Sequence, residues 1–106
     1  MSKFIVILRY EGAADDRFDR DYYVNSHTPR ALETWNPCGL LSERAFFPAA
    51  PAEGKGTVCM AELIFEDAAS FKAALAAPGS AALFADVANF TDLSPSLSVL
   101  SPLPMA

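Results

Sequence analysis

Two long stretches of the chain are rich in β-branched and aromatic residues, as expected for β-strands. Residues 3–10 and 57–66 each place apolar side chains on two faces, interrupted by Arg9 in the first stretch and Glu62 in the second. One face of each stretch is fully apolar, with the side chains Phe4, Val6, Leu8 and Tyr10 in the first and Cys59, Ala61, Leu63 and Phe65 in the second. Residues 40–49 and 93–100 are predicted as two further strands.

Between the strands, the pattern changes to helical spacing. Asp19 is a plausible N-cap for a helix that continues to about Trp35 and ends in the turn-forming residues 36–39. Pro29 lies inside this helix and lacks a backbone donor, so we expect a kink or a restart near Thr28. A second helix is predicted at 68–77, capped by Asp67 and ended by Pro78-Gly79, and a further helical segment at 80–88 precedes a turn at 89–92.

This order of elements, βαββαβ, predicts an α+β ferredoxin-like fold: a four-stranded antiparallel sheet with helices on one face. A sheet covered on one side is expected to alternate apolar and polar residues. Because the first and third strands carry apolar residues on both faces, the open face needs a partner. A second copy of the chain is the simplest one, so the pattern predicts a homodimer joined sheet to sheet.

Length, composition and charge narrow the functional classes. The chain has 106 residues and a formal net charge of -5, which fits a single domain at 1–106 and lacks the basic stripe of a nucleic-acid-binding protein. No apolar stretch approaches the roughly 20 residues that span a bilayer. The first strand is too short for a secretory leader, so we expect a cytoplasmic protein without membrane association. Cys38 and Cys59 are then expected to stay reduced.

Most of the side chains that could take part in catalysis lie in the first helix. Tyr23 and His27 are four residues apart and share a helix face, with Asp19 one turn earlier. His27 is the single histidine, which makes it the natural candidate for proton transfer, and Pro29 frees a carbonyl nearby that could fix the tautomer of its ring. The alternative is a structural histidine, exposed or hydrogen-bonded in the core.

Other residues are compatible with supporting roles. A carboxylate at Asp86 or Asp92 could orient His27, although both positions are equally suited to capping helix ends and turns. Trp35 and Phe90 are most simply core residues. With one His and no closely spaced Cys pair, the chain offers too few ligands for a zinc site, and we expect no metal. It also lacks a glycine-rich phosphate loop and the Gly-x-Ser-x-Gly motif of serine hydrolases.

Two segments resemble a known family. Phe18-Asp19, Tyr22-Tyr23, His27 and Pro29 are similar to the F-D-x-x-Y-Y-x-x-x-H-x-P signature of EthD proteins, and residues 84–92 resemble the family segment before the last strand. The family is named after a gene cluster for ethyl tert-butyl ether degradation. The resemblance implies a dimeric α+β barrel with a pocket between sheet and helices in each subunit.

The resemblance also implies which residues act. It points to His27, Asp86 and either Tyr22 or Tyr23 as catalytic candidates, and we take Tyr23 because it shares the helix face of His27. Tyr22, Trp35 and Phe90 are then candidates for binding a small hydrophobic ligand. Relatives with this fold include cofactor-free monooxygenases, cyclases, dehydratases, isomerases and haem-handling proteins, so the fold alone does not choose among them.

Three hypotheses follow for a small protein of a catabolic or secondary-metabolite pathway. The first is an enzyme without cofactors, in which His27 moves a proton of a hydrophobic or aromatic carbonyl or enol compound and Tyr23 stabilises the oxyanion. The second is a non-catalytic accessory or ligand-binding protein that supports an oxygenase system. The third is haem binding through His27.

Overall fold

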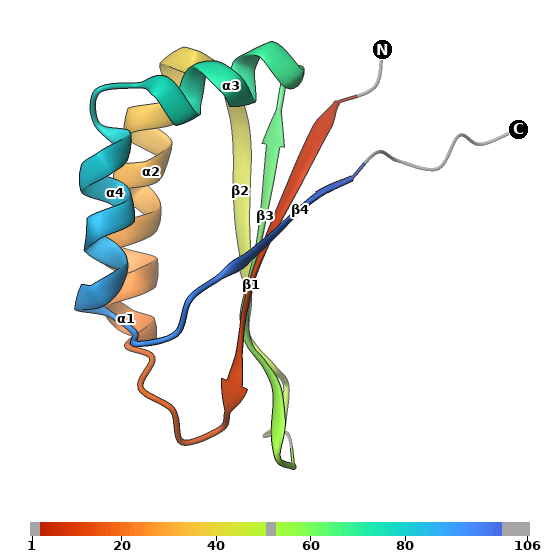
Figure 1. Ribbon diagram of the computed structural model, residues 1–106, viewed down its shortest axis with the longest axis vertical. Helices are drawn as coiled ribbons and strands as arrows, with labels where there is room; N and C mark the ends of the chain where they lie inside the picture. Colours follow the sequence, from red (N-terminus) through yellow and green to blue (C-terminus); the bar gives the residue numbers. More distant parts are fainter. Residues whose placement is uncertain (1–2, 51–52, 101–106) are drawn as a thin grey trace, which may run out of the picture.

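The computed structural model describes residues 3–50 and 53–100, which form one antiparallel sheet with helices on one side (Figure 1). The strands lie in the order β2-β3-β1-β4, so the first and third strands of the sequence occupy the centre. The strands are β1 Phe4–Ala13, β2 Leu40–Phe46, β3 Lys55–Phe65 and β4 Ser96–Leu100. The predicted ferredoxin-like arrangement is confirmed.

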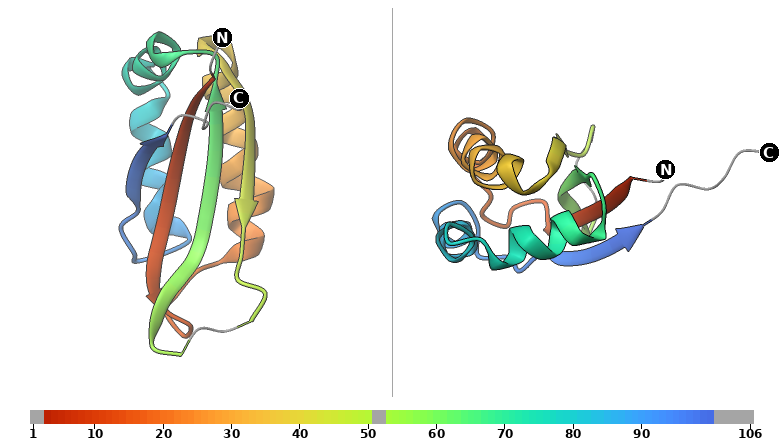
Figure 2. Two further views of the ribbon diagram at one scale, coloured as in Figure 1. Left: turned by 90° about the vertical axis from the view of Figure 1, so that its right-hand side faces the viewer. Right: turned by 90° about the horizontal axis from the view of Figure 1, so that it is seen from above.

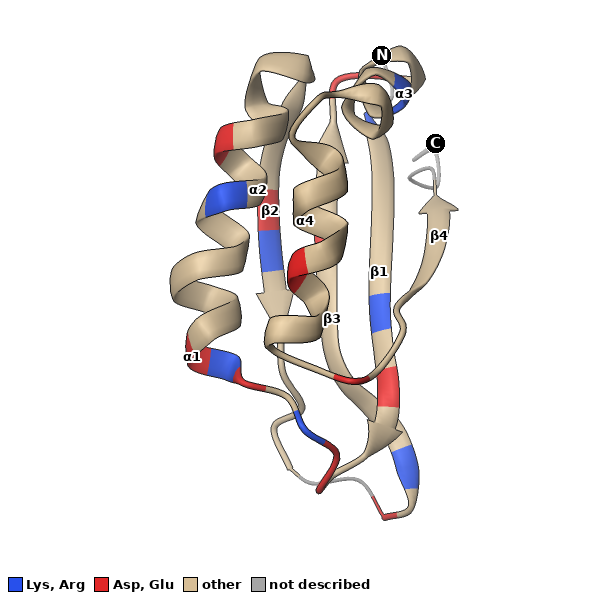
Figure 3. Ribbon diagram, turned by 60° about the vertical axis from the view of Figure 1, so that its left-hand side comes forward, with Lys and Arg blue, Asp and Glu red and all other residues tan. Residues whose placement is uncertain are grey.

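Helices α2 and α4 run side by side along the sheet, and α3 lies across one end of it (Figures 1 and 3). The helical segments are α1 Arg20–Tyr22, η1 Tyr23–His27, α2 Thr28–Trp35, η2 Asn36–Cys38, α3 Ala68–Ala76, α4 Ser80–Asp86 and η3 Val87–Asn89. Among the described residues, no single helix is long and apolar enough to cross a membrane; only the pair Ala68–Ala76 and Ser80–Asn89, bent by 78°, meets that requirement together. Lys and Arg are interspersed with Asp and Glu over the ribbon (Figure 3).

The predicted interruption of the first helix is a π-helical turn. Asp19 caps α1 by accepting a hydrogen bond from the Tyr22 backbone N–H at 3.0 Å. The next turn, η1, widens so that the N–H of Thr28 bonds to the carbonyl of Tyr23, five residues back. Pro29 has no N–H to offer a regular helical bond, and α2 begins at Thr28. Such π-turns often occur at functional sites, and this one contains His27.

The fully apolar faces of the two central strands lie on the same side of the sheet. Val6 lies opposite Leu63 and Leu8 opposite Ala61, and this face is covered by the helices. The main core contains the buried residues Val6, Ala31, Trp35, Leu40, Ala61, Leu63, Phe65, Ala74 and Leu83. Helix burial of this apolar face is therefore the main source of hydrophobic stabilisation in the fold.

The boundaries of all four predicted strands are corrected. The first strand is Phe4–Ala13 and not residues 3–10. The second strand ends at Phe46 rather than residue 49, since Pro48 lacks the donor that a longer ladder needs. The third begins at Lys55 and ends at Phe65, because its pairing with β1 reaches Ala13. The last strand begins at Ser96 rather than residue 93, since Pro95 cannot donate to the ladder.

Strand β2 contains an irregularity that the alternation does not predict. Leu40 pairs with Phe65 and Ser42 with Ile64, so one extra residue is present between these pairs. After this bulge, Glu43 pairs with Leu63 on the helix-covered face. A glutamate thereby enters the layer between sheet and helices.

The opposite face of the sheet is uncovered within the described part of the chain (Figure 2, left). Strand pairing and alternation place Ile5, Ile7, Met60, Ile64 and Phe46 on it. Arg44 and Glu62 form an ion pair across the same face at 3.1 Å. The face thus combines an apolar surface with one pair of opposite charges.

The two thiols are not joined to each other. Cys38 is half-buried in η2, and Cys59 is fully buried in β3. Burial raises the pKa of Cys59 to about 12, so this thiol is protonated at neutral pH. Cys59 therefore behaves as a small core residue.

Gly39 provides a test of the turn between the first helical layer and β2. Its φ of 116° is strained for other residues, and an added Cβ would overlap the side chain of Ser70. Gly54, with φ 73° and nothing within 4 Å of the position that a Cβ would take, offers a control with backbone strain only. In urea denaturation, we expect Gly39→Ala to lower the free energy of unfolding by about 2–4 kcal/mol and Gly54→Ala by about 1 kcal/mol. Equal losses of unfolding free energy in the two variants would show that the contact with Ser70 does not destabilise Gly39→Ala.

Candidate functional site

The side chains of His27 and Asp86 form the centre of the site. Nδ1 of His27 lies 2.8 Å from Oδ2 of Asp86, joining η1 to the last residue of α4. The side chain of His27 is 12% exposed and that of Asp86 only 3%. When the ring is neutral, an ionised Asp86 accepts a hydrogen bond from its Nδ1–H, which leaves Nε2 with a free lone pair.

Asp86 is held ionised by several donors. Its Oδ1 accepts hydrogen bonds from the Tyr22 hydroxyl at 2.6 Å and the Asn89 amide at 2.9 Å, and the Arg30 guanidinium lies 3.3 Å away. Burial pushes the pKa of Asp86 upward. The hydrogen bonds from Tyr22, His27 and Asn89, with the charge of Arg30, outweigh that effect and hold the pKa at about 2. Asp86 is therefore a fixed negative charge behind the histidine.

Local structure explains how these donors converge. Arg30 follows His27 by three residues, so both side chains lie on the same side of the first helical layer. The chain continues from α4 into η3, which brings Asn89 back onto Asp86. Tyr22 is one residue before the π-turn and contacts Asp86 across the interface between the two helical segments.

Two aromatic rings fix the orientation of the imidazole. The centre of the Phe90 ring lies 4.8 Å from the centre of the His27 ring. The Tyr23 ring stacks on the His27 ring, with 5.6 Å between ring centres and an interplanar angle of 24°. Phe90 is fully buried, and Tyr23 is 1% exposed. Contact with these rings and with Asp86 leaves the imidazole little freedom to rotate.

His27 also faces a cavity of about 70 Å³ between the sheet and the helices. Its lining consists of Leu8, Tyr10, Tyr23, His27, Ala31, Trp35, Glu43, Leu63, Leu83, Phe84, Val87 and Pro95. Most of these side chains are apolar. The indole N–H of Trp35 is already used, since it donates to Ser80 Oγ at 2.7 Å. The polar side chains of the lining that are left to contact a ligand are those of Tyr10, Tyr23, His27 and Glu43.

The predicted site residues fall into two groups. Tyr23, His27 and Trp35 line the cavity, whereas Tyr22, Asp86 and Phe90 lie outside the lining. Asp86 and Phe90 contact His27, and Tyr22 contacts Asp86. Tyr22, and not Tyr23, bonds to Asp86. Burial raises the pKa of Tyr23, and the neighbouring Cys59 and Glu43 raise it further, so its phenol is neutral at physiological pH.

Two expectations about the orientation of His27 have different outcomes. Of the two carboxylates expected near the ring, Asp86 and Asp92, Asp86 is the one in contact. Asp92 instead pairs with Arg17 at 2.9 Å. The partner of Nδ1 is the carboxylate of Asp86, and not a backbone carbonyl freed by Pro29.

Glu43 is the site residue that the sequence pattern did not indicate. Burial raises the pKa of its carboxyl group to about 7. Its Oε1 atom is buried and has no hydrogen-bond partner among the described residues. The only sequence signal was a single acidic residue in a predicted strand, which normally faces solvent.

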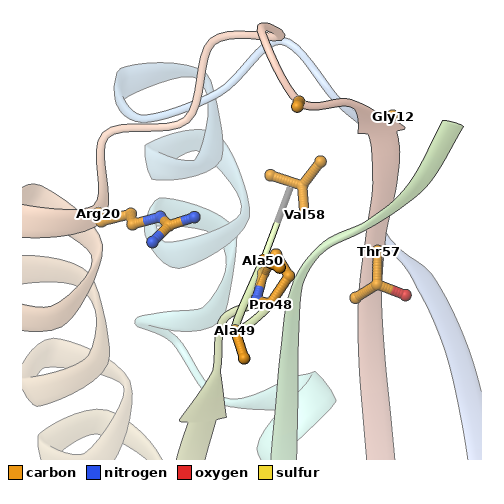
Figure 4. Close-up of a pocket in the computed structure, with 8 residues that line it drawn as sticks. Gly12, Arg20, Pro48, Ala49, Ala50, Thr57 and Val58 are labelled. Atoms are coloured by element: carbon orange, nitrogen blue, oxygen red, sulfur yellow. The ribbon is translucent and has the colours of Figure 1, made fainter. Parts of the chain in front are cut away.

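A second, larger cavity of about 270 Å³ lies near the β2–β3 connection (Figure 4). Figure 4 shows Arg20 from α1 directed toward it, opposite Val58 and Ala50. Its lining residues are Gly12, Ala14, Arg20, Pro48, Ala49, Ala50, Thr57 and Val58. The guanidinium of Arg20 lies 4.7 Å from the centre of the Phe47 ring. None of the predicted site residues is in this lining, and none of its side chains titrates near neutral pH.

The described residues contain no group of three or more His, Cys, Asp and Glu side chains placed to hold a metal ion. The polar groups around the smaller cavity are instead suited to hydrogen bonding and proton transfer. An imidazole and a carboxyl group are side chains that can serve as a general base and a general acid.

Comparison with solved structures identifies relatives of the fold. An EthD-like protein from Ralstonia eutropha JMP134 has a TM-score of 0.79 and 24% identity, with 94% of this chain and 91% of that chain covered. SnoaB, a cofactor-independent oxygenase from Streptomyces nogalater, has a TM-score of 0.64 and 12% identity, with coverage of 98% and 94%. A dimeric ferredoxin-like protein of unknown function from Thermobifida fusca YX has a TM-score of 0.61 and 14% identity, with coverage of 95% and 92%.

These identities are too low to transfer an activity, and they support the fold. No curated protein sequence matches the chain significantly. The family comparison is more specific, because the EthD domain model matches residues 12–94 and so includes the π-turn, the bulged strand and the Asp86 segment. The chain belongs to the EthD domain family.

Proposed function

We propose that the protein is a small enzyme that needs no cofactor and moves a proton of a hydrophobic or aromatic carbonyl or enol compound. The observation that carries the proposal is the His27–Asp86 pair, with Nδ1 and Oδ2 at 2.8 Å, facing an apolar cavity. A base at the edge of an apolar cavity suits substrates whose acidic C–H bond lies beside a carbonyl group.

The proposed step uses the free nitrogen of the imidazole. Nε2 of His27 removes a proton from the carbon next to the carbonyl, and the resulting imidazolium is stabilised by the carboxylate of Asp86. In this proposal Nε2, the ring nitrogen not bonded to Asp86, is the atom directed at the ligand, and the fixed ring orientation lowers the entropic cost of reaching the reactive geometry. The cofactor-independent oxygenase SnoaB, with a similar fold, is consistent with such chemistry but does not identify the reaction.

We further propose that two copies pair through the open sheet face. Its apolar side chains Ile5, Ile7, Met60, Ile64 and Phe46 are uncovered within the described residues, and the relative from Thermobifida fusca is described as dimeric. Pairing would remove this surface from water, which favours association. The helix-covered cavity remains within each copy.

The catalytic proposal predicts the effect of removing the imidazole. We expect wild-type protein in D₂O to accelerate deuterium uptake at the α carbons of 2-butanone and cyclohexanone, measured by ¹H NMR. His27→Ala should slow this uptake by about 10²–10⁴-fold, the usual contribution of a general base. Asn25→Ala, at an exposed position in the same π-turn, should have no effect. Ketone binding without wild-type exchange would contradict the enzyme and favour the accessory ligand-binding role.

The ionised Asp86 predicts a specific dependence of stability on pH. Its pKa in the folded protein, about 2, lies below the ordinary 3.8, so its contribution is present above pH 3.8 and is lost as the pH falls toward 2. The free energy of unfolding of wild-type protein should therefore be higher than that of Asp86→Asn. This difference should decrease by about 2 kcal/mol from pH 6 to pH 2. Urea denaturation across this range measures it, with the exposed Asp21→Asn as control. A constant margin would refute the ionised network.

The dimer proposal is tested by a charge on the open face. Ile7→Asp would bury an unpaired carboxylate in the interface, and we expect it to weaken dimerisation by at least about 100-fold in sedimentation equilibrium. Leu75→Asp, at an exposed position on α3, should leave the dimer intact. Loss of the dimer in the Leu75 variant alone, or a wild-type monomer, would contradict pairing through the sheet.

A further inference from the structure

Two groups able to carry a proton face the same cavity from opposite layers. His27 reaches it from the π-turn in the helical layer, and Glu43 reaches it from β2 in the sheet. The bulge between Leu40 and Ser42 places Glu43 there, since regular alternation from Leu40 would put residue 43 on the open face. A ligand in the cavity therefore lies between an imidazole and a carboxyl group.

The carboxyl group of Glu43 has unused hydrogen-bonding capacity. Its Oε1 atom is buried without a partner among the residues that the structure describes. Leaving such a group unsatisfied has a desolvation cost, which a suitably placed ligand atom would recover. In contrast, the carboxylate of Asp86, on the other side of His27, already has several partners. Glu43 is thus the acidic group of the site that is available to a ligand.

We propose that Glu43 is a second catalytic residue, whose protonated carboxyl group donates a hydrogen bond to the carbonyl oxygen of a neutral ligand in this cavity. The reaction in this proposal depends on the proposed function of His27, whereas ligand binding by Glu43 does not. It identifies the ligand class more closely: an uncharged ketone, aldehyde or enol, rather than a carboxylate.

The proton movements balance between the two residues. His27 Nε2 takes the α proton, the C–H electron pair forms the C=C bond, and the carbonyl π electrons move to oxygen, which takes the proton of Glu43. The ketone becomes an enol, while His27 is protonated and Glu43 is ionised. Return of a proton from His27 to a carbon of the ligand, and of the hydroxyl proton to Glu43, restores both residues. The net change is a proton shift, with no oxidant or reductant.

The cavity lining argues for an uncharged ligand. No Lys or Arg is among its lining residues, so a ligand carboxylate would lose its hydration without gaining a permanently cationic partner. An ionised Glu43 would also repel it. A neutral carbonyl oxygen meets neither penalty and can accept the proton of Glu43.

The titratable groups that face Glu43 determine which pH range tests the proposal. Tyr10 on β1, Tyr23 on η1 and Cys59 on β3 all have pKa values raised chiefly by burial, so they remain neutral between pH 6 and pH 8. Because the pKa of Glu43 is about 7, its protonated fraction falls about tenfold over this range. His27 is the remaining titratable group of the lining, so a variant must control for it.

The test compares 2-butanone with its isosteric anion propionate. Binding is followed at pH 6 and pH 8 by the NMR signal of the indole N–H of Trp35, the sole tryptophan, which lines the cavity. We expect wild-type affinity for 2-butanone to be about tenfold higher at pH 6 than at pH 8. Propionate should bind at least tenfold more weakly than 2-butanone at both.

Variants assign the effect to one residue. Glu43→Gln, whose amide donates at every pH, should bind 2-butanone with the same affinity at pH 6 and pH 8. Glu62→Gln, altered on the opposite face of the sheet, should keep the tenfold difference. His27→Gln should keep it too, and should lose only α-proton exchange. A histidine variant that abolishes the pH dependence would overturn the role of Glu43.

Three further results would also overturn the inference: no binding of 2-butanone by wild-type protein, equal binding at both pH values, or propionate bound as tightly as 2-butanone. The proposed function fails separately. If wild-type protein binds 2-butanone with the expected pH dependence but exchanges no α protons, the carbonyl assignment stands and the catalytic role of His27 and Glu43 is lost.

Discussion

The geometry of the site depends on the carboxylate of Asp86. Its contacts with Tyr22, His27 and Arg30 tie the last residue of α4 to the first helical layer. A buried carboxylate is stable only when its charge is compensated, so these groups must come together for the helices to pack as they do. The same compensation fixes the proton of His27 on Nδ1. Helix packing and the chemical state of the imidazole therefore have a common cause.

Much of the fold could be predicted because its information is local and periodic. The pattern in β1 and β3 identified which residues share a face of the sheet, and Pro29 marked the change at Thr28 because a missing donor affects the helix wherever it occurs. His27 was found because it is the single histidine and lies in a family motif. Asp86 was a candidate on the motif, but its contact with His27 depends on tertiary packing.

The remaining parts depend on features that have no local pattern. Tyr22 and Tyr23 are adjacent, and only the widened turn and the position of α4 decide that Tyr22 bonds to Asp86 while Tyr23 faces the cavity. Glu43 was missed because one bulge residue reverses the face of every residue after it. A strand prediction gives the two-residue alternation, but it does not say which set of residues faces the helices. The bulge exchanges the two faces of β2 after Leu41, and no residue type around Leu41 marks it.

The two carboxyl groups of the site show how one fold can give the same functional group opposite properties. Asp86 lies where hydrogen bonds and a guanidinium outweigh burial, so its pKa is about 2. Glu43 lies in an apolar layer where burial has no such compensation, so its pKa is about 7. Separated pKa values of this kind are what assign acid and base roles in enzymes. An uncompensated Glu43 weakens the core that β2 helps to form, and replacement by an apolar residue would strengthen it. If a ligand carbonyl accepts the proton of Glu43, as proposed, binding offsets the cost of burying this carboxyl group, and the bulge in β2 then belongs to the site.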